Sequence, residues 1–98
     1  MEFQKIRRIH PSWTACELML QHSSRKTGSY WIDSAVAFYR GAERVKYLYL
    51  GAGTKNDSAL AIERILSYGF KQAGSRLNQE WEHIRFVRES DPEADENP

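Results

Sequence analysis

The fold is decided by residues 30–70, which read YWIDSAVAFYRGAERVKYLYLGAGTKNDSALAIERILSYGF. In residues 30–40 two sets of side chains alternate, Ile32, Val36 and Phe38 on one side of the chain and Trp31, Ala35, Ala37 and Tyr39 on the other. This alternation of β-branched and aromatic residues is typical of a β-strand. Residues 45–50 alternate in the same way after the short turn 41–43, so the two stretches are predicted to pair as a hairpin.

A helix is predicted directly after this hairpin. Glycines break the second strand, and Thr54 with Asp57 three residues later forms the capping-box pattern of a helix N-terminus. Gly69 suits the left-handed position that closes a helix, so the helix is expected to end near Tyr68. One stripe of the helix is predicted to pack on the sheet, and it consists of Ser58, Ala59, Ile62, Ile65 and Leu66.

The segment before the hairpin has weaker patterns. Residues 3–9 alternate with breaks in phase and are predicted to form an N-terminal strand that ends before Pro11. Residues 13–22 fit either a strand or a helix capped at Ser12. The strand is preferred, because residues 23–29 then form a hairpin loop into the next strand.

The segment after the helix is also ambiguous. Leu77, Trp81 and Ile84 fit a helix, whereas Ile84 and Phe86 on either side of Arg85 fit a strand. We prefer a strand over residues 82–88. The last ten residues contain five acids, two prolines and no base, which favours disorder.

These elements together predict an α+β fold. It consists of an antiparallel β-meander of three to five strands with one main amphipathic helix packed on one face, which makes a two-layer sandwich. Residues 1–88 are expected to form this single globular domain, and residues 89–98 a disordered acidic tail. Such a scaffold serves many unrelated functions, so the fold class alone assigns none.

The charge of the chain is divided between the two parts. Residues 1–88 carry all fourteen Lys and Arg but only eight acids, whereas residues 89–98 carry five acids. Residues 1–88 thus have a formal charge of +6 and residues 89–98 one of −5, which together give the net charge of +1. This pattern favours a basic surface with an acidic partner, for which the tail is able to compete.

Composition indicates the compartment. The single Cys16 excludes an internal disulfide framework and fits a reducing environment. No run of about 18 apolar residues is present, and the N-terminus lacks the apolar stretch of a signal peptide. We therefore expect a cytoplasmic protein that does not bind a membrane.

No pattern of residues points to an enzyme, a cofactor or a metal centre. The carboxylates are explained by helix capping or by solvation, and Cys16 lies among apolar residues as a small core residue would. The three histidines have no metal-ligand spacing. In the glycine loop Thr54 precedes Lys55, the reverse of the order in a phosphate-binding loop. We expect no catalysis, no cofactor and no metal.

Protein binding is the preferred functional hypothesis. Leu60 lies on the polar side of the helix beside Arg64, and Trp31 and Tyr39 share a strand face that one helix need not cover. These four are the candidate contacts of a non-catalytic binding protein whose partner is another protein or a nucleoprotein complex. Phage and mobile-element inhibitors of the anti-CRISPR type have this size and lack of motifs, although many are acidic. The sequence also leaves a homodimer open.

Direct binding of DNA or RNA is the alternative hypothesis. Basic residues occur in small groups with aromatic residues nearby for stacking, as phosphate-binding surfaces require. The candidate residues for a nucleic acid or another acidic partner are Lys5, Arg7, Arg8, Arg44 and Lys46.

Overall fold

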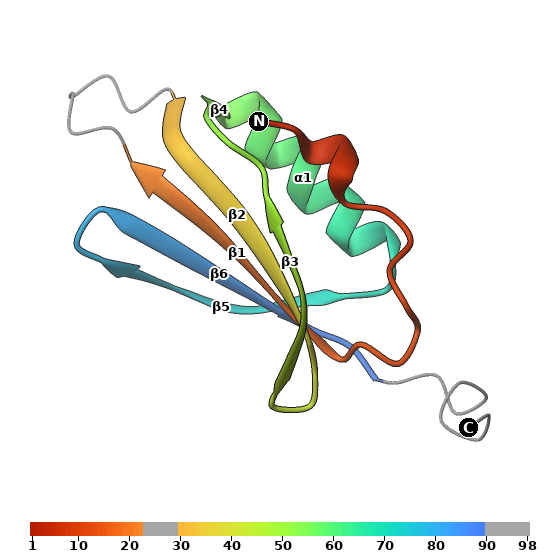
Figure 1. Cartoon of the computed structure of the whole chain (residues 1–98). Coiled ribbons are helices and arrows are strands. Elements are labelled where there is room, and N and C mark those ends of the chain that lie inside the picture. Colours follow the sequence, from red (N-terminus) through yellow and green to blue (C-terminus); the bar gives the residue numbers. More distant parts are fainter. Residues whose placement is uncertain (23–29, 90–98) are drawn as a thin grey trace.

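The protein forms one antiparallel sheet with one main helix on one of its faces (Figure 1). This computed structural model describes residues 1–22 and 30–89, and for residues 30–32 it describes the backbone alone. The strands are β1 (Ala15–His22), β2 (Tyr30–Arg40), β3 (Glu43–Tyr49), β4 (Gly53–Thr54), β5 (Lys71–Asn78) and β6 (Trp81–Val87). Their order is β3-β2-β1-β6-β5, and β4 also pairs with β2. The predicted α+β two-layer fold is confirmed.

Strands β2 and β3 form the predicted hairpin. They pair antiparallel with Val36 opposite Leu48, and the turn between them contains Gly41 at a φ of 61°. Val36 and Phe38 are buried in the core, and Ala35 and Ala37 point to the opposite side of the sheet. The alternation predicted for this strand is therefore correct where the side chains are described.

Strand β1 lies in the centre of the sheet. It pairs antiparallel with β2 on one side and with β6 on the other, with Leu18 opposite both Val36 and Ile84. The strand interpretations of residues 13–22 and 82–88 are thus confirmed over most of their length. The predicted loop 23–29 lies outside the described residues.

The N-terminal segment is not a strand, and that prediction was wrong. Residues Phe3–Lys5 form a short 3-10 helix, η1, which lies beside the main helix (Figure 1). Ile6 and Ile9 are both buried in the core. Their spacing of three suits a turn-like segment that covers the core, whereas a strand with one buried face requires an even spacing.

The main helix, α1 (Lys55–Ser67), begins with the predicted capping box. The Thr54 amide donates to Asp57 Oδ2 at 2.9 Å, and the Asp57 amide donates to Thr54 Oγ1 at 3.3 Å. The hydrogen bond from the Thr54 amide lowers the pKa of Asp57. Gly69 has a φ of 88°, so it occupies the left-handed position that closes the helix as expected.

The buried stripe of α1 differs in part from the prediction. Ser58, Ala61 and Ile65 are buried, whereas Ala59 is exposed and the Leu66 side chain is 44% exposed. The sequence pattern favoured the large side chain of Leu66. The buried positions follow the 58–61–65 spacing instead, because α1 packs on the N-terminal segment with Ile6 and Ile9 as well as over the sheet.

Strand β5 was not predicted. All eight of its residues are exposed, and Leu77 is its only large apolar side chain. Because it is an edge strand that buries neither face, its sequence lacks the alternation by which the other strands were recognised. Ala73 is inserted between Gln72 and Gly74 as a bulge in its pairing with β6.

Candidate functional site

The sheet has one covered face and one uncovered face. Its covered face carries Leu18, Leu20, Val36, Phe38 and Phe86, which form the core with α1 and η1. Since α1 and η1 both lie on that side, the described chain places no helix on the opposite side of the sheet (Figure 1). We call the opposite side the open face.

Cross-strand pairs arrange the open face in rows. Two rows cross all five long strands, Tyr47, Ala37, Glu17, Arg85 and Gly74 in one and Tyr49, Ala35, Met19, His83 and Arg76 in the next. Directly paired residues of antiparallel strands point to the same face. The open face is therefore aromatic on β3, has small side chains on β2, carries Glu17 and Met19 on β1, and is basic on β5 and β6.

The aromatic side of the open face is accessible. The side chains of Tyr47 and Tyr49 are 51% and 55% exposed, and the neighbouring Ala35 and Ala37 are almost fully buried. A hydrogen bond to Asp33 raises the pKa of Tyr49. The guanidinium carbon of Arg44 lies 5.5 Å from the centre of the Tyr47 ring, a cation–π distance. These contacts orient the aromatic side chains and leave part of each ring accessible.

The basic side of the open face contains one ion pair and several unpaired cations. His83 Nδ1 and Glu17 Oε1 are 2.5 Å apart, and both side chains are about one-fifth exposed. Arg76 and Arg85 lie next to this pair and are exposed. Within the described ranges neither arginine forms an ion pair.

Two adjacent hollows lie on the open face. The larger has a volume of about 490 Å³ and is lined by Ala15, Glu17, Tyr39, Gly41, Ala42 and Arg85. The smaller, of about 240 Å³, is lined by Glu17, Gly74, Ser75, Arg76, His83 and Arg85. Glu17 and Arg85 line both, so the two hollows are neighbours on one surface.

The four predicted protein contacts do not form one patch. Tyr39 lines the larger hollow of the open face, whereas Leu60, 41% exposed, and Arg64 lie on α1 in the other layer. Arg64 Nε donates to the carbonyl of Ile6 at 3.0 Å and so holds the N-terminal segment against the helix. The backbone of Trp31 pairs with Gly53, and its side chain lies outside the described part of the structure.

The predicted basic residues are largely brought together. Lys5, Arg7, Arg8 and Lys46 line a hollow of about 280 Å³ with Trp13 and Leu48, which we call the basic hollow. Lys5 forms an ion pair with Glu2 and lowers the pKa of that carboxylate. Arg44 does not join this hollow, because it pairs with Tyr39 on the open face.

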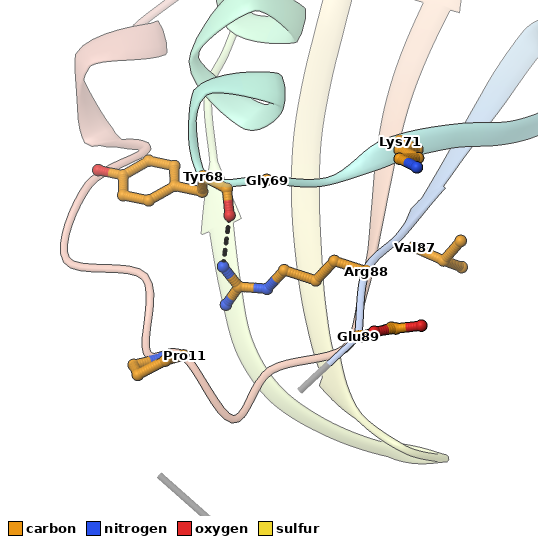
Figure 2. Close-up of a pocket in the computed structure, with 7 residues that line it drawn as sticks. All are labelled: Pro11, Tyr68, Gly69, Lys71, Val87, Arg88 and Glu89. Carbon is orange, nitrogen blue, oxygen red and sulfur yellow. Dashed lines mark hydrogen bonds between the residues drawn. The ribbon is translucent and has the colours of Figure 1, made fainter. Parts of the chain in front are cut away.

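A further hollow is built around Arg88 (Figure 2). It has a volume of about 770 Å³ and is lined by Pro11, Tyr68, Gly69, Lys71, Val87, Arg88 and Glu89. The Arg88 guanidinium donates to the carbonyls of Trp13, Tyr68 and His10 and lies 4.2 Å from the Phe70 ring centre. Burial lowers the pKa of Arg88. This side chain joins the helix end, the loop before β1 and the end of β6, so its evident role is structural.

The remaining chemistry is sparse. Cys16 is buried in the core, and this burial raises the pKa of its thiol. Residues 1–22 and 30–89 contain no group of three His, Cys, Asp or Glu side chains arranged to hold a metal ion. Among the helices of these same residues, none has the length and apolar character needed to cross a bilayer.

Comparisons of the chain with protein-family models, with curated proteins and with solved structures return no match. Function is therefore inferred from the chain's own residues. The sequence had not indicated Arg76, His83 and Arg85 as site residues, although the spacing of His83 and Arg85 along one strand face was visible. Their place beside Glu17 depends on the pairing of β6 with β1.

Proposed function

We propose that this protein is a small non-catalytic binding protein whose open face contacts another protein, alone or within a nucleoprotein complex. The observation that supports this most is a sheet face left uncovered by the described chain, with Tyr47 and Tyr49 about half exposed on it. Arg44 and Asp33 contact these two tyrosines, but the half of each side chain that stays exposed contributes nothing to the stability of the isolated domain. A partner that removes them from water would gain that contribution.

The composition of the open face matches that of protein interfaces. Tyr, Met and Arg are enriched at interface centres, and Tyr and Arg are frequent among the residues that dominate affinity. Tyr39, Met19 and Arg85 lie on this face on the adjacent strands β2, β1 and β6. Rigid aromatic side chains lose little conformational entropy when they are buried by a partner.

An inhibitor from a phage or mobile element, of the anti-CRISPR type, is one form of this proposal. Such an inhibitor needs a rigid surface and no catalytic group, and the present domain is small and has an ordered face of this kind. We place its action in the cytoplasm, because the lone Cys16 fits a reducing compartment.

Affinity purification from the native host after exhaustive nuclease digestion tests the proposal. We expect a stoichiometric protein partner whose affinity falls by about 2 kcal/mol, roughly thirty-fold, in Tyr47→Ala or Tyr49→Ala. Leu60→Ala is the matched control, since it removes a similarly exposed side chain from the other layer. Equal losses of partner affinity in the tyrosine variants and in Leu60→Ala would show that the open face is not the functional surface. The recovery of no protein partner would show the same.

Nucleic-acid binding is the second candidate, and the basic hollow is the observation that favours it. Arg7, Arg8 and Lys46 surround Trp13, which combines phosphate-binding cations with an aromatic ring. If this hollow binds DNA or RNA, the logarithm of the binding constant should fall steeply with the logarithm of salt concentration. Deleting residues 89–98 should then tighten binding, because five competing carboxylates are lost. An absence of binding at low salt in both forms would exclude this function.

A further inference from the structure

We propose that the open face recognises an acidic segment of its protein partner. In this arrangement a carboxylate of the partner binds between Arg76 and Arg85, and an apolar side chain of the same segment fills the hollow beside Tyr39. The inference rests on the proposed function, because it assigns the chemistry of the partner to the same face.

The open face carries an excess of unpaired positive charge. Four of its residues are basic by position in the sheet, namely Arg44, Lys71, Arg76 and Arg85. None of them forms an ion pair with another described residue, whereas Lys5 and Arg40 elsewhere pair with Glu2 and Glu43.

The two carboxylates of the open face are already engaged. Glu17 is bound to His83, and Asp33 accepts a hydrogen bond from the Ser34 amide at 3.0 Å and another from Tyr49. Neither forms an ion pair with one of the four cations, and four cations against two carboxylates leave a formal excess of two positive charges on this face. The missing negative charge is expected to come from the partner.

The smaller hollow provides the seat for a carboxylate. Arg76 and Arg85 line it from adjacent strands, and His83 lies beside them. Guanidinium groups bind carboxylates through paired, charge-assisted hydrogen bonds. Because His83 is held by Glu17, the pair forms a fixed wall of the hollow.

The larger hollow is the proposed binding position of the apolar side chain. Ala15, Ala42 and Tyr39 line it together with Glu17 and Arg85, which it shares with the smaller hollow. Alternate side chains of an extended segment lie on one side, roughly 7 Å apart. One extended segment can therefore place an apolar and an acidic side chain in the two neighbouring hollows.

Other occupants fit this face less well. A second copy of the chain would bring the same excess of positive charge to the interface, so the cations would remain uncompensated. A nucleic acid carries a phosphate at every nucleotide and would bring successive phosphates against Glu17 and Asp33, whereas a peptide segment can place a single carboxylate between Arg76 and Arg85. Pairing of a partner strand along the β5 edge is discouraged by the bulge at Ala73 and by the exposed Lys71 and Arg76.

Peptide titrations followed by NMR of the ¹⁵N-labelled full chain test the inference. The probes are short peptides of equal length with a Leu-Phe anchor in a Glu, Gln or Lys background, and oligo(dT) is the nucleic-acid probe. We expect the Glu peptide to shift amide signals of β1, β5 and β6 and to bind at least about tenfold more tightly than the Gln peptide. The Lys peptide should not bind.

Variants that reverse or remove the charge of one arginine locate the site. Arg76→Glu should weaken binding of the Glu peptide at least about tenfold, and Arg85→Gln should also weaken it. Lys55→Glu changes the net charge as Arg76→Glu does but at the exposed start of α1, so it is expected to leave the affinity within about twofold. The ¹⁵N spectrum of each variant confirms that the fold is retained.

The outcomes separate this inference from the proposed function. If the Gln or Lys peptide bound this face as tightly as the Glu peptide, the face would bind protein without acid selectivity, and only the inference would fail. If no peptide bound at millimolar concentration, the inference would fail, and the proposed function would be decided by the affinity purification alone. Binding of oligo(dT) on the same residues, or self-association through them, would overturn the acidic protein segment as the occupant.

Discussion

The two faces of this sheet are built from the same strands and differ in almost every physical property. In β2, Phe38 is buried in the core against Trp13 and Phe70, and Tyr39, the next residue, lines a hollow on the open face. The covered face combines large apolar side chains with a helix and η1, whereas the open face combines the alanines of β2 with accessible tyrosines and arginines. Alternation within one strand therefore places the residues that stabilise the fold on one face and leaves the residues of the other face available to contact a partner.

The largest difference between the two faces is expected when the neighbouring residues Phe38 and Tyr39 are each replaced by Asp. Phe38→Asp buries a charge without a partner, so it is expected to cost about 5 kcal/mol or more, near the whole stability of a small domain. Tyr39→Asp should cost about 1 kcal/mol, because its side chain borders solvent. Urea denaturation measures both, and comparable losses would mean that the two faces are not distinct.

The helix that covers the core provides a second, smaller contrast. Ile65→Ala leaves a cavity under α1 and should cost about 2–5 kcal/mol. Leu66→Ala removes an exposed side chain and should remain within about 0.5 kcal/mol. Thermal unfolding of the two variants decides between the observed stripe and the stripe predicted from sequence. A larger loss of stability in Leu66→Ala than in Ile65→Ala would support the stripe predicted from the sequence instead.

The helix cap gives the smallest expected effect. The pKa of Asp57 is lowered in the folded state, so the stabilisation it provides is complete above its unfolded pKa of about 4 and is lost as the pH falls through the lower folded value. Asp57→Asn should therefore be less stable than the parent at neutral pH, with a difference that shrinks in acid. Unfolding curves across this pH range measure the difference. A gap that does not depend on pH would exclude a role for the ionised carboxylate.

The sequence was most informative where the signals are local. The β2–β3 alternation and the Thr54–Asp57 cap each involve neighbours in the chain, and both were predicted correctly. The N-terminal strand was wrong because Ile6 and Ile9 are buried by packing against α1. Strand β5 was missed because it buries nothing and its pairing with β6 is its only sheet contact among the described residues.

The candidate site was predictable to a smaller extent. The alternation of β2 placed Tyr39 on a strand face that one helix need not cover. The assembly of Arg76, His83 and Arg85 beside Glu17 requires β6 to lie next to β1 and β5 to lie next to β6. These residues are separated from Glu17 by more than half of the chain, and no local pattern encodes that contact. Leu60 and Tyr39 were grouped together because the sequence could not show that the sheet lies between them.

Side-chain footprinting of the protein bound to its captured partner tests the central claim most directly. Hydroxyl radicals modify accessible aromatic and aliphatic side chains, so the protection of each face of the sheet can be measured separately. We predict that Tyr39, Tyr47 and Tyr49 become protected in the complex, while Leu60 and Leu66 on α1 are modified as in the free protein. Protection of the leucines with unchanged modification of the three tyrosines would contradict the assignment of recognition to the open face.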